Sequence, residues 1–138
     1  MTTIVFDGKT LATDSQITAG DVIVTSENKI TKLNSGGFVA FTGNTFYDSS
    51  IAGYFNELLE KPIIEDETTH GLFFDGARLW HFDYKFRMFE VTGKYAIGTG
   101  REFAYAAMEC GKNAIEAVEI ACKFDVYSSL PVNSVVIK

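Results

Sequence analysis

The 138-residue chain is predicted to be an α+β protein built from antiparallel strands and separate helices. Three observations support this class. The first third of the sequence consists of short strand-like runs joined by tight turns. Helical spacing of apolar residues then appears in one central stretch and in two adjacent stretches near the C-terminus. Strands and helices do not alternate regularly, which argues against a doubly wound parallel sheet.

The strand-like runs are rich in apolar and β-branched residues and are bounded by Gly, Asn or Asp. Asp7-Gly8 separates the first two runs and indicates a hairpin. The next two runs, at residues 21–25 and 29–33, are expected to pair with each other. In chain order, the predicted strands cover residues 3–7, 10–14, 21–25, 29–33, 38–43, 70–75, 78–83, 85–91, 95–100 and 132–138.

Three helices are predicted. Asn44 or Thr45 can cap the start of the first helix. Cys110 falls on the apolar face of the second helix, and a capping box of Asn113 and Glu116 begins the third. The apolar face of the first helix is formed by Tyr47, Ile51, Tyr54, Phe55 and Leu58.

Composition excludes several classes of protein. The formal net charge is −6, so neither nucleic acid nor an anionic membrane surface is an expected partner. No apolar run approaches the ~18 residues of a spanning helix, and the N-terminus lacks the features of a signal peptide. The two cysteines, Cys110 and Cys122, are expected in helix cores, as in a reduced cytoplasmic protein. No His/Cys/Asp cluster has the spacing of metal ligands, so no metal or cofactor is expected.

Thr2 is the first candidate for catalysis. Removal of Met1 would leave a threonine that carries both a hydroxyl group and a free α-amino group. With a reference pKa of about 7.7–8.0, that amine is partly unprotonated near neutral pH and can take the hydroxyl proton directly or through one water. This is the N-terminal threonine form of a nucleophile–base pair. Threonine after methionine is nevertheless common and usually has no catalytic meaning.

A pattern along the whole chain gives Thr2 a context. The segments TTIV, LATDSQITAG, NKITKL and FVAFTGNT resemble, in order, the N-terminal half of proteasome β-subunits and of HslV, the bacterial peptidase that works with an ATP-driven unfoldase. AIGTGREFAYAAM and Asp125-Val126-Tyr127-Ser128 are similar to later segments of the same family. The resemblance implies one N-terminal nucleophile (Ntn) hydrolase domain over residues 1–138. Its fold would be a four-layer αββα sandwich of two antiparallel sheets.

The resemblance also implies catalytic roles. Lys29 would lie near the Thr2 hydroxyl, where a cation lowers the pKa of the terminal amine and stabilises developing negative charge. Asp14 would keep Lys29 charged and oriented, and Gly43 would donate its backbone N–H to the tetrahedral oxyanion. The remaining side chains would surround the amine and relay its proton. The implied catalytic set is Thr2, Asp14, Lys29, Gly43, Thr99, Asp125 and Ser128.

Each of these positions also has a structural interpretation that the sequence leaves open. Gly98-Thr99-Gly100 is in addition a weak match to a phosphate loop. The structural interpretations are an exposed strand lysine for Lys29 as for Lys32, a turn carboxylate for Asp14, a helix-entry glycine for Gly43, a helix N-cap for Thr99, and helix-end or turn residues for Asp125 and Ser128.

Substrate-binding residues are implied by the same resemblance. Phe41 would fill much of the first side-chain pocket, which favours small or medium side chains. The residues expected at or near this pocket are Ile17, Thr18, Gly20, Glu27, Thr31, Phe41 and Thr45.

The sequence departs from the family pattern at several points. Only KPIIEDETT separates the first helix from the strand at 70–75, where the family carries a second long helix, so one helical layer is expected to be reduced. Thr99 replaces the usual Ser, and Asn44 follows Gly43 where many members have a second Gly. If Met1 persisted, the Thr2 nitrogen would be an amide and could not act as a base.

The leading hypothesis is a threonine-type peptidase or amidase that acts on peptide or protein substrates through an acyl-enzyme. The resemblance implies a homo-oligomeric ring and adds an ATP-dependent unfoldase as a candidate partner. The alternative is a catalytically silent, proteasome-like assembly or binding subunit, and a third interpretation is a small-ligand-binding domain. Competing nucleophiles are weak, since His70 and His81 have no carboxylate partner that the sequence identifies.

Overall fold

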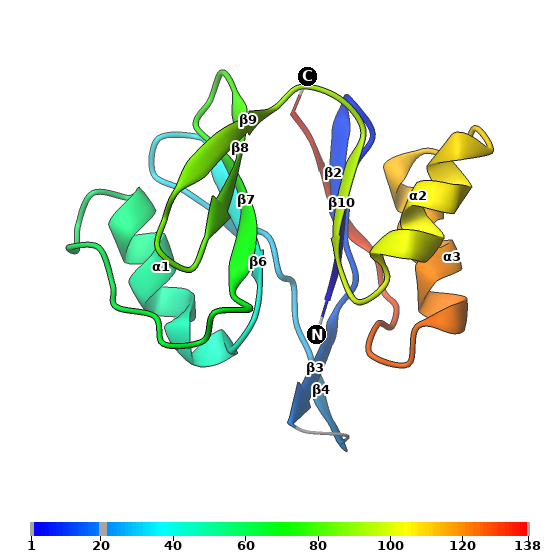
Figure 1. The fold of residues 1–138 in the computed structure, drawn as a ribbon, viewed down its shortest axis with the longest axis horizontal. Helices are drawn as coiled ribbons and strands as arrows, with labels where there is room; N and C mark the ends of the chain where they lie inside the picture. Colours follow the sequence, from blue (N-terminus) through cyan, green and yellow to red (C-terminus); the bar gives the residue numbers. More distant parts are fainter. Residues whose placement is uncertain (1, 20–21, 138) are drawn as a thin grey trace. The chain divides into compact units, whose positions relative to one another are not determined.

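A computed structural model of the protein describes residues 2–19 and 22–137. The chain divides into two compact units. The terminal unit comprises residues 1–29 and 92–138, and the central unit comprises Ile30–Val91. Each unit contains an antiparallel sheet with at least one α-helix packed on it, which confirms the α+β class (Figure 1). The prediction of one domain over residues 1–138 and that of four stacked layers stay predictions.

The terminal unit contains a four-stranded antiparallel sheet in the order β10-β1-β2-β11. The inner strand β1 pairs with β10 on one side and β2 on the other, so that Thr3 lies opposite Gly98 and Ile4 opposite Thr13. This pairing fixes the start of the chain beside the end of β10. The strands are β1 (Thr3–Phe6), β2 (Thr10–Thr13), β10 (Tyr95–Gly98) and β11 (Asn133–Val136).

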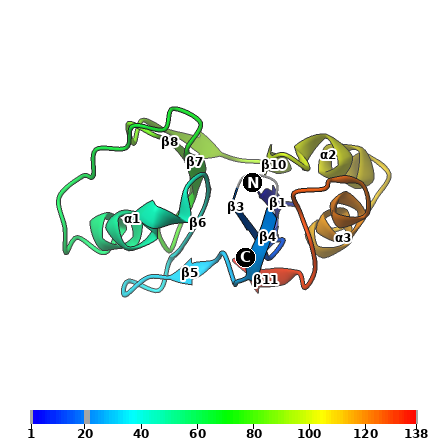
Figure 2. The ribbon, with the colours of Figure 1, turned by 90° about the horizontal axis from the view of Figure 1, so that it is seen from below.

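Two helices, α2 (Arg101–Glu109) and α3 (Ala114–Phe124), lie side by side against this sheet (Figures 1 and 2). The predicted capping box of α3 is confirmed, because Asn113 and Glu116 each accept a hydrogen bond from the other's backbone N–H. Many residues of this core are alanines, which allow close approach of helix and sheet. The buried core is formed by Val5, Ala12, Ala96, Ala104, Ala107, Met108, Ala114, Ala117 and Val118.

A separate hairpin in the terminal unit corrects one prediction. Strand β4 (Val22–Ser26) pairs with β3 (Gln16–Ala19), not with residues 29–33. Strand β3 is not among the predicted strands, because Asp14-Ser15 has the character of a strand end and instead forms the junction between β2 and β3. All five residues of β4 are exposed, so the apolar side chains of Val22, Ile23 and Val24 do not indicate a buried strand.

The central unit contains a five-stranded antiparallel sheet in the order β5-β6-β7-β8-β9. A 3₁₀ turn, η1 (Thr45–Tyr47), leads from β6 into α1 (Asp48–Phe55), which packs on one face of this sheet (Figure 2). Aromatic rings fill the core, and the Phe55 and Phe73 rings stack with their centroids 4.2 Å apart. Of the 12 phenylalanines of the chain, Phe41, Phe55, Phe73, Phe82 and Phe86 belong to this core. The strands are β5 (Thr31–Lys32), β6 (Phe38–Thr42), β7 (His70–Phe74), β8 (Leu79–Asp83) and β9 (Met88–Val91).

The first predicted helix is shorter than its apolar spacing indicated. Helix α1 ends at Phe55, and Glu57 adopts a left-handed conformation with φ of 60°, which stops the helix. Leu58, expected on the apolar face, is exposed. Asn44 caps η1 by accepting a hydrogen bond from the Phe46 N–H at 2.8 Å. Residues 56–69 contain no helix, as the short KPIIEDETT segment predicted.

Within the described residues, none of the helices combines the length and the apolar character that crossing a bilayer requires.

Candidate active site

Thr2 is buried directly before β1, with 4% of its surface exposed. Its carbonyl oxygen accepts a hydrogen bond from the Thr99 N–H at 2.9 Å. Gly98 makes this contact possible because its φ is +98° and a Cβ atom there would overlap the Thr2 carbonyl. The turn after β10 therefore holds the first residues of the chain in place.

Lys29 lies next to the Thr2 hydroxyl. Its ammonium group donates hydrogen bonds to Thr2 Oγ1 at 2.8 Å and to Asp14 Oδ1 at 3.0 Å. The side chains of Lys29 and Asp14 are 6% and 0% exposed, so the exposed-lysine interpretation is wrong for Lys29, while Lys32 is exposed. Burial lowers the pKa of the Lys29 ammonium below its ordinary value, and the charge of Asp14 opposes that shift.

Asp14 is held by backbone donors from three parts of the chain. Its Oδ1 accepts the Thr3 N–H at 3.0 Å, and its Oδ2 accepts the N–H groups of Gln16 at 3.0 Å and Ser129 at 3.2 Å. A buried carboxylate needs such donors in addition to a cation. These bonds fix the carboxylate that orients Lys29.

A second polar cluster forms around Asp125, at the C-terminal end of α3. Asp125 Oδ2 accepts hydrogen bonds from Thr99 Oγ1 and Ser128 Oγ, both at 2.6 Å. Ser128 Oγ lies 2.7 Å from Thr3 Oγ1. Thr99 is not a helix N-cap, because Gly100 occupies that position in α2. The three residues expected around the terminal amine therefore form one hydrogen-bonded group.

Several residues that join these clusters are not among the predicted site residues. Thr3 bonds to both, through its backbone N–H and its hydroxyl. Gln16 and Ser129 contribute backbone N–H groups to Asp14, and the Ser15 N–H donates to the Ser129 carbonyl at 2.9 Å. These residues could not be recognised from the sequence, because a backbone N–H donor does not depend on residue type and threonine is common in strands.

Other predicted site residues belong to the central unit or to the hairpin of β3 and β4. Gly43, Phe41 and Thr45 belong to the central unit, and their roles toward Thr2 stay predictions. Gly43 has φ of +142°, and a Cβ atom there would approach Thr69 Oγ1 to 2.7 Å. The remaining predicted substrate-binding residues are Ile17 and Thr18 on β3, Glu27 after β4, Thr31 on β5, and Gly20, which is outside the described residues.

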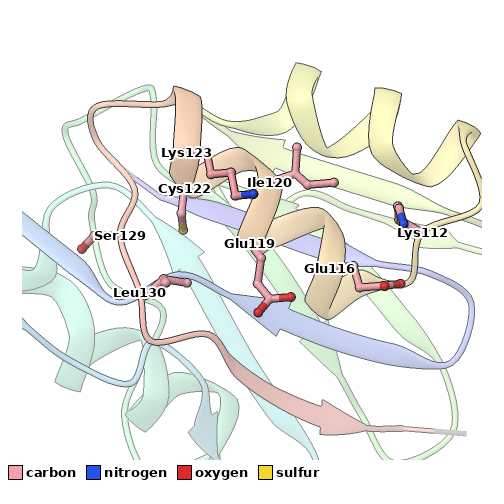
Figure 3. A pocket seen from close by; sticks show the side chains of 8 residues that line it. All are labelled: Lys112, Glu116, Glu119, Ile120, Cys122, Lys123, Ser129 and Leu130. Carbon is pink, nitrogen blue, oxygen red and sulfur yellow. The ribbon is translucent and has the colours of Figure 1, made fainter.

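The cysteines are poor competitors of Thr2. Cys122 lines a pocket of about 580 Å³ between α3 and the segment at Ser129 and Leu130 (Figure 3). Burial, together with the charges of Asp14 and Asp125, raises the pKa of the Cys122 thiol to about 12, so it is protonated at neutral pH.

Cys110, expected in the core, is instead exposed, at the end of α2. Residues 2–19 and 22–137 contain no group of three or more side chains placed to hold a metal ion.

Comparisons with known proteins identify the fold. No family model matches the chain, and no curated protein matches it. Among solved structures, Thiobacillus denitrificans BPH is 22% identical with a TM-score of 0.75, over 98% of this chain and 96% of that one. The same protein in complex with Epoxomicin gives 21% and 0.77, over 99% and 97%. Eukaryotic HslV from Trypanosoma brucei gives 21% and 0.74, over 98% and 97%.

The chain therefore has the fold of the Ntn hydrolases. Within that class it has the fold of HslV-type, proteasome-like proteins, and the resemblance suggested by the sequence is confirmed. Identities of 21–22% establish the fold alone, so support for an activity has to come from the residues of this chain.

Proposed function

We propose that the protein is a threonine-type peptidase or amide hydrolase whose nucleophile is the hydroxyl of Thr2 after removal of Met1. The observation that carries this proposal is the 2.8 Å hydrogen bond from the Lys29 ammonium to Thr2 Oγ1. A cation in that place stabilises the negative charge that develops when the hydroxyl loses its proton. Asp14 holds the cation in this orientation at 3.0 Å.

The base is the α-amino group of Thr2. Its reference pKa of about 7.7–8.0 allows it to accept the hydroxyl proton near neutral pH. The positive charge of Lys29 disfavours protonation of this neighbouring amine and keeps more of it in the basic form. The group formed by Thr99, Asp125 and Ser128 then holds the amine and returns its proton to the leaving group.

The reaction proceeds in two steps. Thr2 Oγ attacks an amide carbonyl, the C–N bond breaks, and the leaving amine departs with the proton while an ester to Thr2 remains. Water then attacks this ester, releases the acid and regenerates the hydroxyl. The Gly43 N–H is the proposed donor to the oxyanion in both steps.

Substrate and assembly are also part of the proposal. Peptides or unfolded proteins are the substrates, and Ile17, Thr18, Gly20, Phe41 and Thr45 contribute to substrate binding. The protein works as a homo-oligomeric ring in the cytoplasm, with an ATP-dependent unfoldase as candidate partner. The fold shared with HslV supports the ring and the unfoldase by analogy.

One observation favours the second candidate, a catalytically silent assembly or binding subunit. The segment of residues 56–69 contains no helix, where the family carries a long one. A subunit without activity, however, has no need of a buried Lys29–Asp14 pair beside Thr2. Covalent labelling of Thr2 separates the two candidates.

The test is covalent labelling followed by intact-mass measurement. A peptide epoxyketone presents two electrophilic carbons, so a complete adduct requires both the hydroxyl and the free amine of Thr2, whereas a β-lactone requires only the hydroxyl. We expect protein lacking Met1 to gain the mass of either probe. Thr2→Ser should still label and Thr2→Ala should not.

The controls distinguish the outcomes. The spectrum of the unlabelled protein reports whether Met1 has been removed. Processed protein that never labels would support the silent subunit. Labelling that persists in Thr2→Ala would identify a different nucleophile.

A further inference from the structure

We propose that Thr3 is a positioning residue for the reaction, because its hydroxyl donates to Ser128 and its backbone bonds to Asp14. This inference rests on the proposed function of Thr2. Thr3 follows the nucleophile in the chain, is fully buried in β1, and reaches the Asp125 cluster with its side chain. It thereby joins the Asp125 cluster to the Lys29–Asp14 pair.

The direction of the hydrogen bonds follows from proton counting. An ionised Asp125 carboxylate can only accept, so the single hydroxyl proton of Ser128 is donated to Asp125 Oδ2 at 2.6 Å. Ser128 Oγ can then only accept from Thr3 Oγ1, at 2.7 Å. The result is a directed chain from Thr3 through Ser128 to Asp125.

The backbone of Thr3 is fixed at the same time. Its N–H donates to Asp14 Oδ1 at 3.0 Å, and its carbonyl accepts the Asp14 N–H at 3.2 Å. Gly100 leaves room for the Thr3 hydroxyl, since a Cβ atom at residue 100 would overlap Thr3 Oγ1. The φ of Gly100 is −92°, so the need for glycine there comes from this contact and not from the backbone conformation.

The hydrogen bond from Thr3 limits how strongly Ser128 Oγ can accept a hydrogen bond from the Thr2 amine. A hydroxyl oxygen has two lone pairs, and Thr3 occupies one of them. Without the Thr3 proton, Ser128 Oγ would be a stronger acceptor for the ammonium form of Thr2. The amine would then hold its proton more tightly and become a basic group only at higher pH.

The first experiment measures the rate of epoxyketone labelling against pH for Thr3→Val and Thr3→Ser. Thr3→Val keeps the shape and removes the hydroxyl. We expect it to label about fivefold to tenfold more slowly at pH 7, as loss of one hydrogen bond implies. The acidic limb of its pH–rate profile, on which the labelling rate rises with pH, should move to higher pH. Thr3→Ser should restore both the rate and the limb.

Thr13→Val is the matched control. Thr13 is also fully buried in this sheet, but its hydroxyl has no hydrogen-bond partner among the described residues. Its replacement should leave the rate and the pH profile unchanged. An acidic limb that stays in place in Thr3→Val, or moves equally in Thr13→Val, would overturn the proposal.

A second measurement does not depend on activity. Urea unfolding of Thr3→Val, Ser128→Ala and the double variant forms a thermodynamic cycle. We expect the loss of stability in the double variant to be smaller than the sum of the single losses, because both changes remove the same hydrogen bond. Strict additivity would refute the Thr3–Ser128 link. If the wild type never labels but the cycle shows coupling, the proposed function fails and this link stands.

Discussion

The ammonium group of Lys29 lies 2.8 Å from the hydroxyl oxygen of Thr2, and both side chains are buried. This contact places a positive charge where deprotonation of Thr2 would create a negative one. In a site that excludes water such a charge is worth more than on the surface. It also makes Lys29 the residue whose replacement tests the proposed reaction most directly.

Replacement of Lys29 by methionine should abolish most of the labelling. Removal of one preorganised group that stabilises developing charge commonly lowers rates about 10²–10³-fold, and we expect a loss of that size. Breaking a buried ion pair also leaves Asp14 uncompensated, which costs about 3–5 kcal/mol of stability. The measurements are the labelling rate and urea unfolding. Lys32→Met, at an exposed strand position, is the control and should change neither.

The alkaline side of the pH profile should report Lys29. Burial lowers its pKa from the ordinary value of 10.5, with Asp14 opposing the shift. The group is charged below the lowered pKa and loses its charge as the pH rises through it, so the labelling rate should begin to fall below pH 10.5. Lys29→Arg, which stays charged at these pH values, should lack this decline if it labels. A decline of the same midpoint in Lys29→Arg would assign it to another group.

Gly98 and Gly8 form a matched pair for testing the contact between the turn after β10 and the Thr2 carbonyl. Their φ angles are +98° and +101°, so alanine at either position carries the same backbone strain, about 1–2 kcal/mol. Only at Gly98 would the new Cβ overlap the Thr2 carbonyl, while at Gly8 it meets nothing within 4 Å. We expect urea unfolding to show a distinctly larger loss for Gly98→Ala. Equal losses would mean that the turn after β10 does not hold the chain start.

The central unit should lose stability in acid through its histidine pair. His70 Nδ1 and His81 Nε2 lie 3.1 Å apart, and burial lowers the pKa of His81 from 6.5, with Asp83 opposing. Below pH 6.5 the unfolded chain therefore binds more protons at His81 than the folded one. The free energy of unfolding should fall as the pH drops through this range.

The check is urea unfolding at pH 8 and pH 5 for the wild type and for His81→Gln. The variant lacks the titrating imidazole, so its stability should depend less on pH. If the two proteins lose the same stability between these values, other groups cause the dependence.

The grouping of several candidate site residues could be predicted from the sequence through its resemblance to a known family, and not from residue type alone. Thr2, Asp14 and Lys29 were expected together, and the structure brings them within hydrogen-bond distance. The position of Thr99 beside Asp125 was expected as well. Thr3 was missed because its hydroxyl acts through a contact with Ser128, 125 residues away in the chain.

The errors in the fold have similar causes. Strand β4 was assigned the wrong partner because all its residues are exposed, so no burial pattern marks its neighbour. Its pairing with β3 includes a register shift between Ile17 and Thr18, which no sequence period reveals. Helix α1 was predicted too long because Leu58 continued the spacing beyond the left-handed Glu57.

The terminal unit also determines when the site can exist during protein synthesis. Strand β1 needs β10, and β2 needs β11 at residues Asn133–Val136, while the Asp125 cluster forms only after α3. The central unit, in contrast, is continuous from Ile30 to Val91 and has its own core, so it can fold while the ribosome is still adding residues. Thr2, Asp14 and Lys29 precede the central unit in the chain, whereas Thr99, Asp125 and Ser128 follow it. A nascent chain that reaches only the central unit therefore contains Thr2, Asp14 and Lys29 but lacks β10, β11 and the Asp125 cluster, so the proposed site is complete only after those segments have been added.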